Sequence, residues 1–193
     1  MAAGICSNVS ASSQEYMAGL KDDSIATYPN AVWFGGTIKD TVQEYAGQMQ
    51  DWGVFRLPAM DRGGLRTSNL GGSVLVIPSC CRNKQAAWAF LEYALCTREG
   101  QLAQYRNFDL FPALLPALGD PFFDEPDPFY GGQKVRRLFA TDVTRIPALY
   151  RTADWAEAMR YLDQSLSRWA AGGMRSGGLF AELERKLQRR LGR

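Results

Sequence analysis

Three carboxylates stand close together in the second half of the sequence, at Asp124, Glu125 and Asp127. A pair of carboxylates can serve as acid and base in glycoside hydrolysis, which needs no histidine, and carboxylate oxygens also bind calcium. A calcium-binding loop needs ligands at a fixed alternation that ends in a bidentate glutamate, and this segment lacks that pattern. We therefore interpret the segment as a solvated charged turn and keep a carboxylate-based glycoside-processing enzyme as an alternative.

The sequence contains no histidine, which excludes Ser-His-Asp and Cys-His nucleophiles and every histidine-ligated metal site. The cysteines lack the paired Cys-x-x-Cys spacing of metal sites; they are Cys6, Cys80, Cys81 and Cys96. A bridge between the adjacent Cys80 and Cys81 would distort the backbone, so we expect two turn thiols there and a buried, apolar role for Cys96. We predict no catalytic residue, no metal site and no cofactor.

Two features of the sequence could contact phosphate groups. The glycine-containing loop Asp61–Ser68 has neither a following helix N-terminus nor a P-loop lysine, so we expect a hairpin turn there instead. The last predicted helix is basic, but the formal charge of the chain is only +2 and no aromatic residues interleave with the basic ones. The sequence therefore predicts no nucleic-acid partner.

The clearest structural element is a strand-turn-helix unit. The residues of Asn69–Gly72 favour a turn, and Val74–Ile77 is an unbroken aliphatic run, which is the pattern of a strand covered on both faces in a parallel sheet. Apolar residues then recur at helical spacing from Ala87 to Leu95. Thr97 is well placed to cap a second helix.

The rest of the sequence combines helical patterns with short apolar runs. Phe108–Tyr130 contains five prolines, which forbid a long helix, so we expect an extended crossing segment with aromatic anchors there. We expect helices at Gln14–Lys21, Thr37–Ala46, Gln133–Ala140, from Trp155 to Gly172, and from Phe180 to Leu191, and short strands at Ser24–Tyr28 and Gly53–Leu57.

Four passages, taken in order, resemble one protein family. They are AVWFGGTIKD (Ala31–Asp40), WGVFRLPAM (Trp52–Met60), the stretch Asn69–Gln101 with AAWAFLEYALCTREGQ, and FPALLPALGDPFFDEPDPFYGGQKVRRLF (Phe111–Phe139). From about Leu20 onward the chain is similar to the extracellular solute-binding proteins of ABC importers, especially the sugar-binding members. The resemblance implies an α/β fold that is the C-terminal portion of a two-lobed, type II periplasmic-binding-protein fold, helix-rich and with incomplete sheets.

The resemblance also implies how the chain is divided. Residues 1–70 would form part of the second, C-terminal lobe, residues 71–127 a crossing segment with a strand and helices of the first lobe, and residues 128–193 the helical remainder of the second lobe. A complete family member is about twice as long, so we expect a fragment. Its strand would then have an unpaired edge, the helix with Trp88 and Phe90 would expose apolar surface, and the isolated chain would be poorly stable.

The resemblance places an aromatic sugar contact at Trp33. In the family, the tryptophan at this position stands at the mouth of the sugar cleft. An indole offers a flat apolar face to a sugar ring while its N–H can still find an acceptor. From the residues alone, a buried core position explains Trp33 equally well, since tryptophan is usually buried.

Two further groups of ligand-binding residues follow from the resemblance. Asn69, Gly71 and Gly72 fall where the chain of family members passes between the lobes, so they would lie near both hinge and ligand. Plain turn geometry explains the glycines equally well. Tyr150 and Trp155 fall near the family's second cluster of ligand contacts, although helical spacing alone explains Trp155 as a core residue.

These expectations together describe a binding protein and not an enzyme. The resemblance implies the substrate-binding component of an ABC-type carbohydrate importer, a monomer that holds a sugar or another small polar solute between its lobes and presents it to a membrane permease. It implies a periplasmic or extracellular, membrane-associated location, although this chain carries no export signal and no apolar run that could span a bilayer. A non-catalytic structural or interaction module is the remaining alternative.

Overall fold

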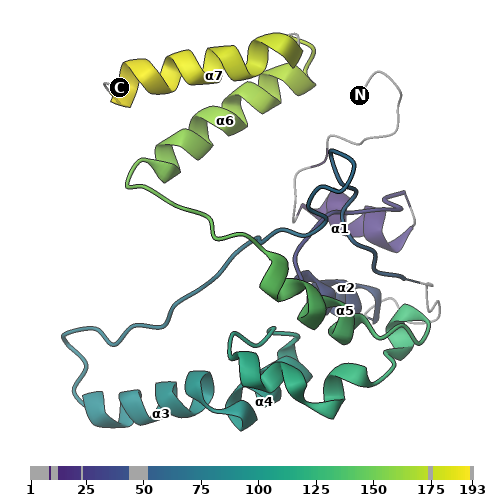
Figure 1. The fold of residues 1–193 in the computed structure, drawn as a ribbon, viewed down its shortest axis with the longest axis vertical. Coiled ribbons are helices and arrows are strands. Elements are labelled where there is room, and N and C mark those ends of the chain that lie inside the picture. The colour runs from purple at the N-terminus through teal and green to yellow at the C-terminus, as the bar shows by residue number, and fades with distance from the viewer. Residues whose placement is uncertain (1–8, 10–12, 23, 44–51, 174–175, 192–193) are drawn as a thin grey trace. The chain divides into compact units, whose positions relative to one another are not determined.

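The computed structural model describes residues 9, 13–22, 24–43, 52–173 and 176–191. Within these ranges the chain is rich in helix, and its contacts divide it into two compact units, Ser12–Pro147 and a unit built mainly from Ala148–Arg193. The α-helices of the described ranges (Figure 1) are α1 (Gln14–Lys21), α2 (Phe34–Gln43), α3 (Lys84–Cys96), α4 (Arg98–Phe108), α5 (Val135–Asp142), α6 (Trp155–Ala170) and α7 (Ser176–Leu191).

Helices α1 and α2 are held by a cap and by aromatic contacts. The Ser13 hydroxyl accepts a hydrogen bond from the backbone N–H of Tyr16 (3.1 Å) and so caps α1. The ring of Tyr16 packs at a tilt against those of Tyr28 and Phe34, with centroids 5.1 and 6.1 Å away. The helix predicted at α1 is confirmed. Helix α2 begins before the predicted Thr37, and residues 44–46 of that prediction lie outside the described residues.

Helices α3 and α4 meet at Thr97, as the sequence predicts. The Thr97 hydroxyl accepts a hydrogen bond from the backbone N–H of Gly100 (3.1 Å), which caps α4, and donates one to the carbonyl of Tyr93 in α3 (2.6 Å). A Cβ at Gly100 would collide with the Tyr93 carbonyl. Only glycine therefore lets the two helices approach this closely.

Helix α3 is mostly apolar and yet contains no buried residue. Trp88 and Phe90 leave 58% and 64% of their surface exposed, so the expected exposure of this helix is confirmed. Cys96 is exposed as well. The prediction that it is buried is wrong, because nothing among the described residues covers this helix completely enough to bury any of its side chains. Cys80 and Cys81 are free thiols next to a turn, as predicted.

The core of the unit Ser12–Pro147 lies between α4, α5 and short 3-10 helices. The helices η1 (Leu115–Gly119), η2 (Pro121–Asp124) and η3 (Pro128–Tyr130) each carry a proline at the first or second position, where no helical N–H is lost. Phe123 is fully buried and packs on Tyr105 of α4, with ring centroids 5.5 Å apart. This proline-rich segment is therefore folded into the core. The prediction that it is extended is wrong, although its aromatic side chains do anchor it.

Regular strands are absent from the described residues, whose one strand-like contact is an isolated antiparallel bridge between Asp127 and Gln133. The strands predicted at Ser24–Tyr28 and Gly53–Leu57 are therefore wrong, and the expected α/β fold reduces here to a helix-rich one. The backbone of Val54 pairs with the side chain of Gln133 and not with a neighbouring strand. The amide oxygen of Gln133 accepts from the N–H of Val54 (2.9 Å) and its nitrogen donates to the Val54 carbonyl (2.7 Å).

The loop that leads to α3 is irregular (Figure 1). The run Val74–Ile77 is not a strand, and Val74 is 85% exposed, because no described segment pairs with the backbone of this run. Earlier in the loop, the N–H of Gly64 donates to the carbonyl of Asp61 (2.9 Å) and closes a turn. No strands flank that turn within the described residues, so the hairpin predicted at Asp61–Ser68 is wrong.

Helices α6 and α7 form an antiparallel pair within their own unit (Figure 1). Glu157 near the start of α6 pairs with Arg190 near the end of α7 (3.1 Å), and Arg168 near the end of α6 pairs with Glu182 (2.7 Å). Both predicted helices are confirmed. Asp154 occupies the N-cap position of α6, but its side chain makes no capping hydrogen bond.

Candidate ligand-binding site

Trp33 lies in the turn that leads into α2, where two contacts hold it. Its indole N–H donates to the carbonyl of Leu70 (3.1 Å), and its ring meets that of the buried Phe34 edge-on, with centroids 5.9 Å apart. Trp33 itself leaves 45% of its surface exposed. The indole is therefore fixed at its polar edge and partly open to solvent, which does not fit the alternative of a fully buried core residue.

The turn Asn69–Gly72 closes against this indole. Gly71 has a φ of +110°, which L side chains rarely adopt, and a Cβ there would lie 3.5 Å from the indole nitrogen of Trp33. The side-chain amide of Asn69 donates to the Gly71 carbonyl (3.4 Å). Gly72 also has a positive φ (+104°) but faces open space. The fold thus brings Trp33 together with Asn69 and Gly71, which are distant from it in the sequence. Gly72 is the next residue of the same turn and makes no close contact of this kind.

Two glycines let the start of α2 approach its neighbours closely. A Cβ at Gly35 would lie 2.9 Å from the hydroxyl of Tyr130, and one at Gly36 would lie 3.3 Å from the Cβ of Asp109. Both distances are tighter than ordinary Cβ contacts, so larger residues would push α2 away from α4 and η3. The Gly-Gly pair therefore helps to set the position of Trp33.

Trp33 lines a polar groove of about 370 Å³, a size within the usual range of small-molecule sites. Thr37 and Asp40 from α2 and Asn107 from α4 also line it. Of these four residues only Trp33 is predicted from the sequence. The spacing of Trp33, Thr37 and Asp40 is nevertheless that of one helical face, which is a signal that could have identified the other two residues of α2.

A buried ion-pair network adjoins the groove. Lys39 Nζ lies 3.1 Å from a carboxylate oxygen of Asp109 and 3.1 Å from one of Asp127, and Arg136 lies 3.1 Å from Asp127. Asp127 is only 4% exposed, so these two cationic partners compensate the cost of burying its charge. Burial raises the pKa of Tyr130, whose ring lies beside Lys39, and keeps its hydroxyl neutral.

Arginine side chains engage two of the three carboxylates that suggested an enzyme, Asp124 and Asp127. Arg137 donates two hydrogen bonds to Asp124 (2.9 and 2.8 Å), and this contact lowers the pKa of Asp124 below its ordinary value. The general acid of a glycosidase needs the opposite shift. The described residues also contain no group of His, Cys, Asp and Glu that could hold a metal ion. The carboxylates of Asp124 and Asp127 are therefore engaged in structural ion pairs.

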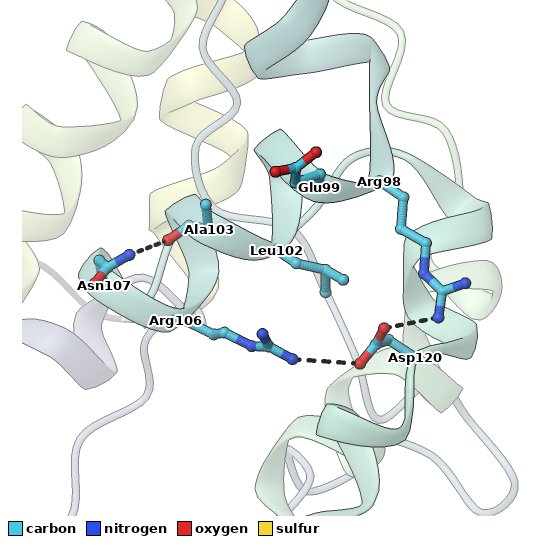
Figure 2. A pocket seen from close by; sticks show the side chains of 7 residues that line it. All are labelled: Arg98, Glu99, Leu102, Ala103, Arg106, Asn107 and Asp120. Carbon is cyan, nitrogen blue, oxygen red and sulfur yellow. Dashed lines mark hydrogen bonds and ion pairs between the residues drawn. The ribbon is translucent and has the colours of Figure 1, made fainter.

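A second, wider hollow of about 570 Å³ lies along α4 (Figure 2). Figure 2 shows the side chains of Arg98 and Arg106 converging on the carboxylate of Asp120, at 2.7 and 3.6 Å. The backbone N–H of Phe122, and then Arg98, lower the pKa of Asp120, which keeps the carboxylate charged. This hollow has no aromatic lining and its two arginines are already paired, so the groove at Trp33 is the better candidate.

The two remaining predicted ligand residues belong to the other unit. Tyr150 is 86% exposed. Trp155 begins α6 and is partly buried, with the guanidinium of Arg151 5.5 Å from its ring centroid. Their role as ligand contacts stays a prediction.

Comparison with known proteins finds sugar-binding relatives. The chain is 26% identical over 117 residues to an arabinooligosaccharide-binding protein of Halalkalibacterium halodurans, 28% identical over 148 residues to a lactose-binding protein of Rhizobium radiobacter, and 28% identical over 158 residues to an arabinooligosaccharide-binding protein of Bacillus subtilis. These matches cover 61%, 71% and 80% of this chain but 26%, 32% and 36% of the relatives. No family model and no solved structure matches the chain.

All three relatives are named for a sugar that they bind, which confirms the resemblance to sugar-binding solute-binding proteins. The chain spans about a third of the length of these curated relatives, or less. Among the described helices, none is at once long enough and apolar enough to cross a bilayer.

Proposed function

We propose that this chain is part of the substrate-binding component of an ABC carbohydrate importer, and that it contacts the sugar. The observation that carries the proposal is the state of Trp33, whose indole is partly exposed, lines a polar groove and is held through its N–H by Leu70. A sugar ring packs its C–H side on such a face while its hydroxyls find partners in the groove. The similarity to sugar-binding proteins supports the same role.

The proposal includes further polypeptide that covers α3. The chain then contributes to a two-lobed, type II fold in which the sugar lies between the lobes and residues 71–127 cross into the first lobe. The exposure of Val74, Trp88 and Phe90 supports this arrangement, because the burial of such large apolar side chains against further polypeptide is favourable. A sheet with which Val74–Ile77 pairs would also satisfy the backbone of that run.

Beside the indole, the turn Asn69, Gly71 and Gly72 presents backbone and amide groups to the ligand. Tyr150 and Trp155 are proposed separately as aromatic ligand contacts of their own unit. The protein acts outside the cytoplasmic membrane as a monomer, delivers its sugar or similar polar solute to a permease, and uses no cofactor.

Isothermal titration calorimetry tests the proposed function. The product of the complete open reading frame that holds this sequence is titrated with arabinotriose, lactose, glucose and xylose, and with proline as a non-sugar polar solute. We expect saturable heat with at least one of the sugars. A well-folded product that gives no heat with any sugar would contradict the proposal.

The isolated chain of 193 residues is expected to be poorly stable and to bind the dye ANS, because the apolar side chains of α3 are uncovered. Thermal melting followed by circular dichroism, together with ANS fluorescence, measures both properties. Replacing Trp88 and Phe90 with serine should lower ANS binding without lowering the melting temperature, since both residues are mostly exposed. A sharp transition well above room temperature without dye binding would count against the proposed cover.

A further inference from the structure

The residues at the start of α2 present one continuous face to the groove. Trp33, Gly36, Thr37 and Asp40 all line it. Gly36, Thr37 and Asp40 lie on one side of α2, and Trp33 lies in the turn directly before the helix. The face therefore combines, within two helical turns, an indole, a bare backbone at the glycine, a hydroxyl and a carboxylate.

The basic side chains that line the groove are already engaged by carboxylates. Lys39 and Arg136 are also largely buried, with 19% and 14% of their side-chain surface exposed. The ion pairs are Lys39 with Asp109 and Asp127, Arg136 with Asp127, and Arg106 with Asp120. Lys39 and Arg136 are therefore poorly placed to attract an anionic ligand, whereas Arg106 keeps 52% of its side-chain surface exposed beside its carboxylate partner.

The groups left facing the groove are mainly hydrogen-bond acceptors. Asp40 is exposed, and no side chain in the described part of the chain pairs with it. An ionised carboxylate only accepts hydrogen bonds. Asn107 donates its amide N–H to the carbonyl of Ala103 (2.7 Å), which leaves its amide oxygen to accept. The hydroxyl of Thr37 can accept or donate, and within the described residues it too has no side-chain hydrogen bond.

We infer that Asp40 and Asn107 form the hydrogen-bonding half of a sugar subsite whose stacking half is Trp33, and that this subsite selects neutral, hydroxyl-rich rings over acidic sugars. This inference rests on the proposed function. A sugar ring supplies what the face lacks: several O–H donors for the acceptors and an apolar C–H side for the indole. The negative charge of Asp40 repels the carboxylate of a uronic acid.

Calorimetry on the product of the complete open reading frame tests the subsite, with arabinotriose, lactose and digalacturonic acid as probes. The variants are Asp40→Asn and Asn107→Ala, with Asp61→Asn as a matched control, since Asp61 is another exposed carboxylate of the same unit that does not line the groove. We expect the first two variants to bind neutral sugar about tenfold to hundredfold more weakly at an unchanged melting temperature, the size expected for hydrogen bonds to charged or polar groups. The control should bind like the parent.

The outcomes separate this inference from the proposed function. If the parent binds a neutral sugar, Trp33→Ala loses it, and both Asp40→Asn and Asn107→Ala keep the parental Kd, then the subsite is wrong and the proposed function stands. Tighter binding of digalacturonic acid than of the neutral sugars by the parent also overturns the subsite. If the folded parent binds no sugar at all, the proposed function fails and the subsite fails with it.

Discussion

Replacing Asp127 with alanine is expected to unfold the unit that holds the candidate site. Asp127 is 4% exposed and pairs with Lys39 and Arg136, and its carboxylate also caps η3 through the N–H of Phe129 (3.1 Å). Removing it leaves two largely buried cations short of a partner, which typically costs about 3–5 kcal/mol. A loss of that size approaches the whole free energy of unfolding of a small domain, and that of this isolated chain is expected to be low.

Urea unfolding followed by near-ultraviolet circular dichroism measures this effect. Asp124→Ala is the matched control from the same segment, because Asp124 also pairs with an arginine but leaves 53% of its side chain exposed. Exposed ion pairs contribute little, so the control should unfold close to the parent. If Asp127→Ala retains the parental spectrum and midpoint, the ion-pair network does not hold this unit together.

Replacing Trp33 with alanine is expected to weaken sugar binding at least about 30-fold, which corresponds to the 2 kcal/mol typical of a tryptophan at the centre of a binding surface. Trp33→Phe should lose less, because the phenyl ring keeps an apolar face but cannot donate to the carbonyl of Leu70. The measurement is calorimetry with the sugar that binds the parent best.

Trp169→Ala serves as the control for the loss of an indole. Trp169 in α6 is exposed to a similar degree, 39% against 45% for Trp33, and does not line the groove. It should leave the affinity unchanged. A Trp33→Ala protein that melts like the parent and binds within threefold of it would show that the indole does not contact the sugar.

Short-range signals in the sequence predict the helices well. Thr97 is predicted as a helix cap, and its hydroxyl caps α4; the cap that Ser13 provides for α1 was not predicted. The regular apolar spacing that begins at Trp155 predicts α6. Such features depend on residues within one or two turns of each other, so they survive whatever surrounds the helix.

Elements that depend on distant partners are predicted poorly. Val74–Ile77 has the composition of a strand, but composition cannot supply a neighbouring strand, and none is present among the described residues. Gly53–Leu57 was expected to pair with a strand, but the backbone of Val54 pairs with the side chain of Gln133 instead. In the proline-rich segment, the prolines do prevent a long helix, yet they also start the 3-10 turns that bury Phe123.

In the candidate site too, residues that depend on distant partners are the ones that the sequence does not predict. The resemblance to a known family predicts Trp33, Asn69 and Gly71, and the structure brings these three residues together. Asn107 could not be predicted, because it joins the groove only when α4 packs beside α2. Asp40 stands at a spacing from Trp33 that indicates a shared face, but that spacing becomes informative only once the indole is known to line a groove.

The carbonyl of Leu70 accepts the hydrogen bond from Trp33, and Leu70 lies shortly before the apolar run Val74–Ile77 in the sequence. A strand that pairs with this run would also restrain the loop whose carbonyl accepts the hydrogen bond from the indole. A sugar that orders the ring would then favour the docking of the run, and docking of the run would raise the affinity for the sugar by the same factor, as thermodynamic reciprocity requires. In such a protein, the docking of Val74–Ile77 and the binding of the sugar would be thermodynamically coupled.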